Sequence, residues 1–114
     1  MTTRALEALD RILNRSEDAD EVLRSTVRVL ADEPGVEWAG IAFLEDGNLV
    51  LGPQAGEPDE RRRIHTPIVF QGAEVGELWV DGDDVDQAFL DRVAFLVSAH
   101  VLIGWDTRGE AWTP

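Results

Sequence analysis

Cysteine and lysine are both absent from this sequence of 114 residues. Without cysteine the protein forms no disulfides, offers no thiolate to a metal and carries no thiol nucleophile. Without lysine it forms no Schiff base with a carbonyl substrate. A chain whose stability does not rest on disulfides is typical of the cytosol, so we expect a cytoplasmic protein.

Long apolar runs are missing as well. No segment reaches the roughly 18 apolar residues of a candidate membrane-spanning helix. Residues 1–7 are amphipathic and have no signal-peptide core. The length fits one domain, and 44% hydrophobic residues suffice for a core. We expect one domain over residues 1–106 and a flexible C-terminal tail over residues 107–114.

Basic side chains are few. Ten arginines face 23 Asp and Glu residues, for a net charge of −13. Such an acidic surface repels nucleic acid phosphates and anionic lipids, so we expect neither nucleic acid nor membrane as a partner. Two explanations of the bias stay open: a salt-rich cytoplasm, where carboxylates keep the surface hydrated, and a GC-rich genome, which replaces Lys codons with Arg codons.

Helical spacing of apolar residues predicts helices over about residues 4–15 and 19–32. Thr2 or Thr3 is expected to cap the first helix. Asp18 is expected to cap the second in a capping-box pattern. A third helix is predicted over about residues 85–105, capped by Asp84. Its second half is apolar almost all round, whereas a helix on a sheet needs one apolar stripe, so we expect a second buried face there.

Between the helices the apolar pattern predicts four strands over about residues 36–45, 48–52, 62–70 and 75–80. Turn residues at 46–47 and 71–74 join them into two hairpins. The order α-α-β-β-β-β-α predicts an α+β domain in which three helices cover one face of an antiparallel sheet.

Three segments resemble GAF domains, over about residues 18–104, and most closely the free methionine-R-sulfoxide reductase branch. They are Trp38-Ala39-Gly40 with the apolar residues after it, Leu49-Val50-Leu51-Gly52-Pro53 followed by Gly56 and Pro58, and Pro67 to Asp81. The resemblance implies a profilin-like sheet in the order 2-1-4-3, with the N- and C-terminal helices on one face and the ligand pocket on the other.

The sequence departs from that branch in three ways. The reductase attacks its substrate with a thiolate, and this chain has no cysteine. Where the reductase has Asp-x-Asp at the end of the last strand, Trp79 takes the first position and only Asp81 remains. The crossover that closes over the ligand is cut to about ten residues, Pro53 to Arg62. We therefore expect no reductase activity, no catalytic residues, no cofactor and no metal.

Strand alternation assigns a set of residues to the former pocket. Two tryptophans and two carboxylates there are suited to a small cationic or zwitterionic ligand, and a histidine is a candidate base. The alternative is that Trp79 fills the space. The predicted ligand-binding residues are Trp38, Glu77, Trp79, Asp81 and His65.

Other charged and polar groups have structural explanations. Arg61, Arg62 and Arg63 are expected at a solvated strand edge, paired with nearby carboxylates, with an anion site as the alternative. His100 is expected to be a buried or interface residue on the last helix. The acidic loop at residues 81–86 has no calcium-loop spacing and is better explained by helix capping.

The apolar terminal helices predict a homodimer, as the GAF resemblance also implies. The expected function is a non-catalytic sensory or regulatory GAF-like module that binds a small molecule or passes a signal to a separate protein. A structural dimer with a filled pocket and a degenerate enzyme using His65 are the alternatives. The predicted dimer-interface residues are Leu6, Leu9, Leu13, Val97, Val101 and Trp105.

Overall fold

The computed structural model describes residues 3–15, 18–83 and 85–104. The predicted order of elements is confirmed, with one added 3₁₀ turn. The elements are α1 (Thr3–Arg15), α2 (Ala19–Ala31), β1 (Val36–Glu45), β2 (Asn48–Gly56), η1 (Glu60–Arg62), β3 (Arg63–Phe70), β4 (Ala73–Gly82) and α3 (Gln87–Gly104). The predicted tail, Trp105, and the capping residues Thr2 and Asp84 lie outside the described residues.

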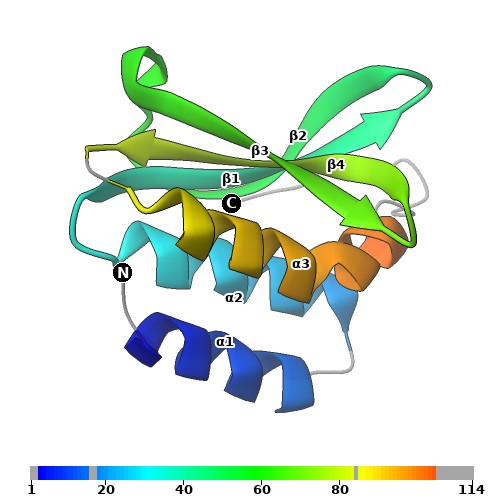
Figure 1. The fold of residues 1–114 in the computed structure, drawn as a ribbon, viewed down its shortest axis with the longest axis horizontal. Coiled ribbons are helices and arrows are strands. Elements are labelled where there is room, and N and C mark those ends of the chain that lie inside the picture. The colour runs from blue at the N-terminus through cyan, green and yellow to red at the C-terminus, as the bar shows by residue number, and fades with distance from the viewer. Residues whose placement is uncertain (1–2, 16–17, 84, 105–114) are drawn as a thin grey trace.

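The strands form one antiparallel sheet in the order β2-β1-β4-β3, as predicted (Figure 1). Two-residue turns close both hairpins. Asp46 and Gly47 have φ angles of 49° and 82°, and Gln71 and Gly72 have 52° and 82°. Positive φ at both central residues defines a type I′ turn, whose twist matches that of the flanking strands. The second turn is therefore tighter than predicted, since β4 begins at Ala73.

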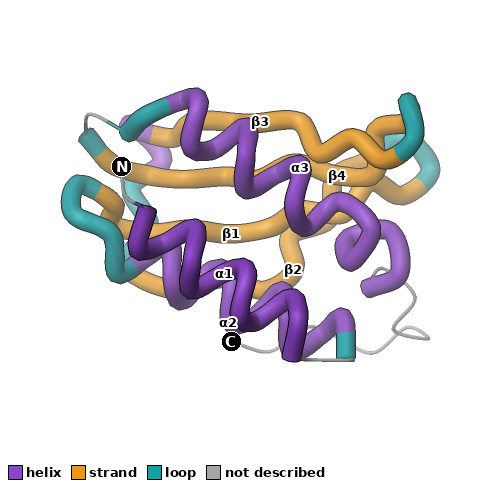
Figure 2. Tube along the Cα trace, turned by 60° about the horizontal axis from the view of Figure 1, so that its bottom comes forward, coloured by secondary structure: helices purple, strands orange, loops and turns teal. Residues whose placement is uncertain are grey.

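The helices lie on one side of the sheet in two layers. α2 and α3 pack against the sheet, and α1 packs on α2 on the side away from the strands (Figures 1 and 2). The expectation that all three helices cover the sheet face is thus corrected for α1. Two helices already cover the face of a four-stranded sheet, so α1 buries its apolar stripe against a helix instead.

The core lies between the sheet and the helices. β1 shows how alternation builds it, because Ala39, Ile41 and Phe43 point to the helices and are 0% exposed. Burying each large apolar side chain contributes about 1.5–3 kcal/mol. The fully buried large side chains of this core are Leu9, Leu23, Leu30, Ile41, Phe43, Ile68, Leu78 and Leu90.

Several element ends differ from the predicted ones. β2 continues to Gly56, so only residues 57–62 cross from β2 to β3, and half of them form η1. Asp18 caps α2 as predicted, by accepting from the Asp20 N–H. α3 begins at Gln87, and the side chain of Asp86 accepts from the Ala88 N–H at 3.0 Å. None of the described helices is long and apolar enough to cross a membrane.

Candidate functional site

The strand register brings the predicted ligand residues together on the sheet face opposite the helices. Trp38 pairs with Asp81 across β1 and β4, and His65 pairs with Trp79 across β3 and β4. Glu77 lies two residues before Trp79 and therefore on the same face. Binding of a ligand by these residues remains a prediction, but their convergence is a structural fact.

Arg63 occupies the centre of this group. Its guanidinium lies over the Trp38 ring, with Cζ 4.3 Å from the ring centroid, and 5.4 Å from that of Trp79. Its Nε and Nη2 donate to the two carboxylate oxygens of Asp81, at 2.7 and 2.9 Å. The aromatic faces and the carboxylate that were predicted to hold a cation therefore hold one from the same chain.

Asp81 is 0% exposed and fully engaged. Besides both bonds from Arg63, its Oδ2 accepts from the backbone N–H of Asp59 at 2.6 Å. A buried carboxylate is tolerated only when it is paired and hydrogen-bonded, and this carboxylate is both. Asp81 also holds the pKa of the Arg63 guanidinium above its ordinary value. The short crossover thus contributes one donor to the same site.

Gly40 allows the Trp38 ring to lie flat on the sheet. A Cβ at position 40 would come within 2.5 Å of Trp38 Cη2 and 2.8 Å of Cζ2. The indole Nε1 donates to Gln54 Oε1 on β2 at 3.2 Å, which fixes the ring from the other side. Trp38 is 1% exposed, although α2 and α3 lie on the opposite face of the sheet. Arg63 is the group stacked on its open face.

Glu77 forms a second polar group beside the first. Its Oε1 accepts from Trp79 Nε1 at 2.7 Å and lies 3.0 Å from His65 Nδ1, which acts as the donor because an ionised carboxylate only accepts. Partial burial acts to raise the pKa of Glu77, but the hydrogen bonds from Trp79 and His65 outweigh it and the pKa lies below its ordinary value. The imidazole of His65 packs on the Trp79 ring at 5.1 Å.

The three consecutive arginines have three different environments. Arg61 is 90% exposed and pairs with Asp59, as expected of a solvated edge. Arg62 binds Asp59 at 3.0 Å, Asp83 at 2.5 Å and the Glu37 carboxylate. The hydrogen bond from Arg62 lowers the pKa of Asp59, and that to Asp83 raises the pKa of Arg62.

The prediction of a solvated strand edge is therefore wrong for Arg63, whose side chain is only 12% exposed and lies on the face of the sheet. The crossover sets this difference. η1 turns the chain just before β3, so that Arg63 is the first residue to follow the strand alternation and point inward. Arg63 and Gln54 are the site residues that the sequence-based selection missed.

Few polar groups on this sheet face remain available to bind a ligand or take part in a reaction. Both carboxylate oxygens of Asp81, and Oε1 of Glu77, accept from donors of the same chain. Across the part of the chain that the structure describes, no three His, Asp or Glu side chains gather in a way that could hold a metal ion. Among the predicted ligand-binding residues with ionisable side chains, His65 is the most exposed, with a side chain 52% exposed.

The residues predicted for a dimer interface are distributed differently. Leu9, Val97 and Val101 are 0% exposed within one chain and belong to its core. Leu6 and Leu13 are half-buried. Trp105 lies outside the described residues. The apolar side chains that α3 does expose are Phe95, at 65%, and Leu102, at 48%.

His100, also on α3, is half-buried. Its Nδ1 is buried and has no hydrogen-bond partner in the structure. Burial lowers the pKa of the imidazole. The imidazole is thus partly buried within one chain, and its role as a buried or an interface residue stays a prediction.

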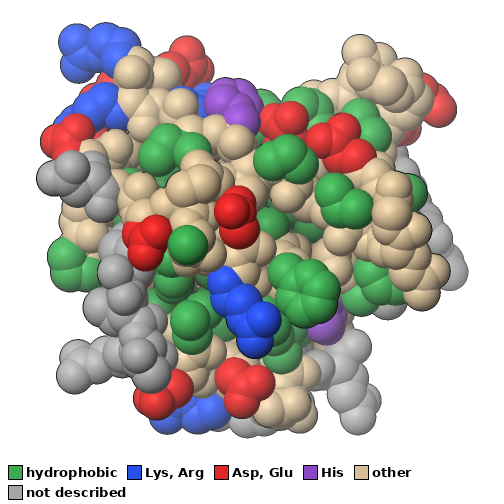
Figure 3. Space-filling view, in the orientation of Figure 1, with side chains coloured by type: hydrophobic (Ala, Val, Ile, Leu, Met, Phe, Trp, Pro, Cys, Tyr) green, Lys and Arg blue, Asp and Glu red, His purple; other side chains and the backbone are tan. Residues whose placement is uncertain are grey.

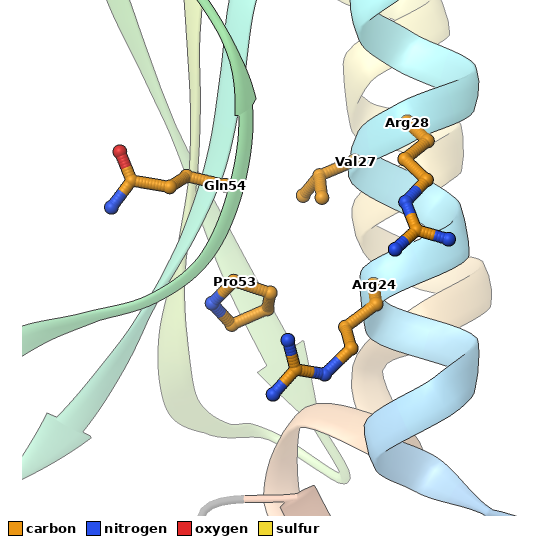
Figure 4. Close-up of a pocket in the computed structure, with 5 residues that line it drawn as sticks. All are labelled: Arg24, Val27, Arg28, Pro53 and Gln54. Atoms are coloured by element: carbon orange, nitrogen blue, oxygen red, sulfur yellow. The ribbon is translucent and has the colours of Figure 1, made fainter. Parts of the chain in front are cut away.

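A small hollow lies between α2 and β2. It is lined by Arg24, Val27, Arg28, Pro53 and Gln54 (Figure 4). Its volume of about 10 Å³ is at the lower limit for one water molecule. The amide of Gln54 points away from the hollow (Figure 4), and its Oε1 accepts from Trp38 Nε1. Arg24 is paired with Asp20 at 2.8 Å. This hollow is too small for a metabolite.

No protein-family model matches the chain, and no curated protein sequence is similar to it. Solved structures match its fold. The GAF domain of an Acinetobacter phosphoenolpyruvate-protein phosphotransferase is 16% identical, with a TM-score of 0.68 over 94% of this chain and 98% of that one. The GAF domain of the Coxiella burnetii phosphotransferase is 15% identical, with a TM-score of 0.69 over 93% and 97%. The chain has the GAF fold.

The free methionine-R-sulfoxide reductase of Neisseria meningitidis, solved with its substrate, is similar in the same way. It is 16% identical, with a TM-score of 0.65 over 92% of this chain and 95% of that one. Identities this low establish the GAF fold and not an activity. The predicted fold class is confirmed, and the function has to be argued from the site.

Proposed function

We propose that this GAF-like chain is a regulatory domain without enzymatic turnover. Its own Arg63 occupies the sheet face opposite the helices, where GAF domains of the reductase branch are expected to hold their ligand. The observation that carries the proposal is the guanidinium of Arg63, bound to both oxygens of buried Asp81 and stacked on Trp38. A small cation would have to displace a group that is tethered to the site. The proposal favours the filled pocket over the binding of a small cationic ligand.

The absence of cysteine supports the non-catalytic assignment, because reduction of a sulfoxide by a thiolate needs a sulfur nucleophile. The degenerate-enzyme alternative needs a free base. His65 is accessible, but no Ser, Thr or Cys lies on β3 or β4 beside it to serve as a nucleophile on this face; Thr66 points to the other side and is 1% exposed.

A binding and activity screen tests this proposal. Tryptophan fluorescence is followed while methionine sulfoxide, free amino acids and nucleotides are added, since Trp38 and Trp79 would report on any ligand at this face. Reduction of methionine sulfoxide is assayed in parallel with a thiol reductant. We expect no saturable response and no turnover. Turnover, or saturable binding that Trp79→Phe weakens, would contradict the filled-pocket proposal.

A homodimer through α3 is the second proposal, and it rests on a different observation. Phe95 and Leu102 lie two turns apart on α3 and are 65% and 48% exposed. Exposed apolar side chains in one stripe of a helix are typical of an association surface. Sedimentation equilibrium over a wide range of concentrations tests it. A protein that stays monomeric throughout would rule the dimer out.

The remaining parts of the proposal concern the cell. We place the protein in the cytoplasm because it contains no cysteine, and we propose that it passes its signal to a separate protein. Fractionation of the source cells, followed by immunodetection, tests the first point. Recovery of the protein from a compartment outside the cytoplasm would contradict it.

A further inference from the structure

A groove of about 290 Å³ separates the edge strand β3 from α3. It is lined by Pro67, Val69, Asp91, Ala94 and Phe95. In Figure 3, which looks onto α3 and β3, hydrophobic side chains are interspersed with charged and polar ones. Val69 is 45% exposed and Phe95 is 65% exposed, the highest value among the large hydrophobic side chains in the described part of the chain. The groove is therefore an apolar surface with a protruding ring at its border.

The edge of β3 disfavours the addition of a further strand. Pro67 has no N–H, and proline is tolerated in a paired strand where its nitrogen faces away from the neighbouring strand. A strand added outside β3 would thus meet a missing donor at this proline, and prolines on edge strands protect sheet edges. The groove is better suited to side chains presented by a helix.

We infer that a second copy of this chain covers the groove, and that Phe95 of each copy inserts beside Pro67 and Val69 of the other. This inference rests on the homodimer proposed above and identifies its contact surface. A two-fold interface joins the same patch on both subunits, so the patch must complement itself. Here the protruding ring and the apolar groove are adjacent on one surface, which is the requirement for mutual insertion.

Charges next to the groove support a second copy as the occupant. Asp91 lines the groove, and Arg92 lies beside the ring, with its Cζ 5.9 Å from the Phe95 centroid. Gln87 Nε2 donates to Asp91 at 2.9 Å and positions that carboxylate. When the α3 helices of two copies pack antiparallel and cross near residues 91 and 92, Arg92 of one copy comes near Asp91 of the other. The two cross-pairs offset part of the repulsion between chains of net charge −13.

Sedimentation equilibrium on the full chain, with single substitutions, tests the contact. Phe95→Ser should weaken dimerisation by about tenfold or more, as expected when a buried aromatic anchor is removed. Val50→Ser is the control, because Val50 is also an exposed apolar side chain, at 41% against 65% for Phe95, and lies on the opposite edge strand β2. It should leave the dimerisation constant unchanged. Thermal melts at low concentration verify that both variants are folded.

A charge exchange tests the proposed pairing. Arg92→Asp should weaken the dimer because it places two carboxylates together at each cross-contact, and Asp91→Arg should do so by placing two cations together. The double variant Asp91→Arg/Arg92→Asp restores opposite charges, so its dimerisation constant should return to within about threefold of the wild type. A mixture of the two single variants should also form a heterodimer.

The possible outcomes distinguish the proposed contact surface from the homodimer proposal on which it rests. A wild-type dimer that Phe95→Ser leaves intact overturns the inference while the homodimer stands. A wild-type protein that is monomeric at all concentrations overturns both. Weakening by Phe95→Ser, no effect of Val50→Ser and recovery in the double variant support the groove as the interface.

Discussion

Replacing Arg63 by alanine removes the cation from a carboxylate that has no access to water. Asp81 is 0% exposed and would keep only the N–H of Asp59, at 2.6 Å, as a donor. Removing one partner of a buried ion pair costs about 3–5 kcal/mol. The lost contact with the Trp38 ring, at 4.3 Å, accounts for about 0.5–2 kcal/mol of a loss of this kind. Domains are stable by about 5–15 kcal/mol, so Arg63→Ala should remove a large part of the folding free energy.

Urea unfolding at neutral pH, followed by tryptophan fluorescence and far-ultraviolet circular dichroism, measures this loss. Arg61→Ala is the matched control, because Arg61 is 90% exposed and its pair with Asp59 faces water. It should change the free energy of unfolding by less than about 0.5 kcal/mol. The double variant Arg63→Met/Asp81→Leu replaces the pair with apolar side chains and should recover most of the stability that Arg63→Ala loses.

A loss below about 1 kcal/mol for Arg63→Ala, the range of exposed salt bridges, would refute the reasoning. It would mean that water reaches Asp81 in the folded variant and that the sheet face does not depend on its internal cation. In the opposite case, low-millimolar methylguanidinium should raise the melting temperature of Arg63→Ala and leave that of the wild type unchanged, because a ligand stabilises only a folded state with an empty site.

Three further changes test neighbouring features. Gly40→Ala should cost about 1–3 kcal/mol in urea unfolding and shift the tryptophan emission, because the new Cβ meets the Trp38 ring at 2.5 Å; an unshifted spectrum at full stability would contradict this packing. The lowered pKa of Glu77 means that its contribution to stability is present above its unfolded pKa, about 4.3, and is lost as pH falls through the folded value. Glu77→Gln should therefore weaken the dependence of the free energy of unfolding on pH below about pH 4.5. An unchanged dependence would count against the hydrogen bonds that Glu77 accepts from Trp79 and His65. The lowered pKa of His100 has the same sign, so stability should decline as pH falls below about 6.5, and His100→Leu should remove that decline in melts between pH 7 and 5; persistence of the whole decline in the variant would assign it to another group.

The candidate site was predictable in part from strand alternation. The period of two placed Glu77, Trp79 and Asp81 on one face of β4, and the GAF resemblance assigned Trp38 to that face. The register then brought Trp38 opposite Asp81. The same rule puts Arg63 on the face of His65, two residues further along β3. Its position within a run of three arginines concealed this, because charge runs are usually solvated and no local pattern marks which member turns inward.

The sequence by itself determined the order of the elements, both hairpins, the faces of the central strands and the absence of thiol chemistry. These follow from periodicity, turn residues and composition, which are local properties of the chain. Only the tertiary structure decided which group fills the sheet face, which apolar residues of α3 are core and which are surface, and that α1 lies outside the layer that covers the sheet. Each of these depends on contacts between segments distant in sequence, and hydrophobicity alone does not specify which of several apolar or charged neighbours is buried.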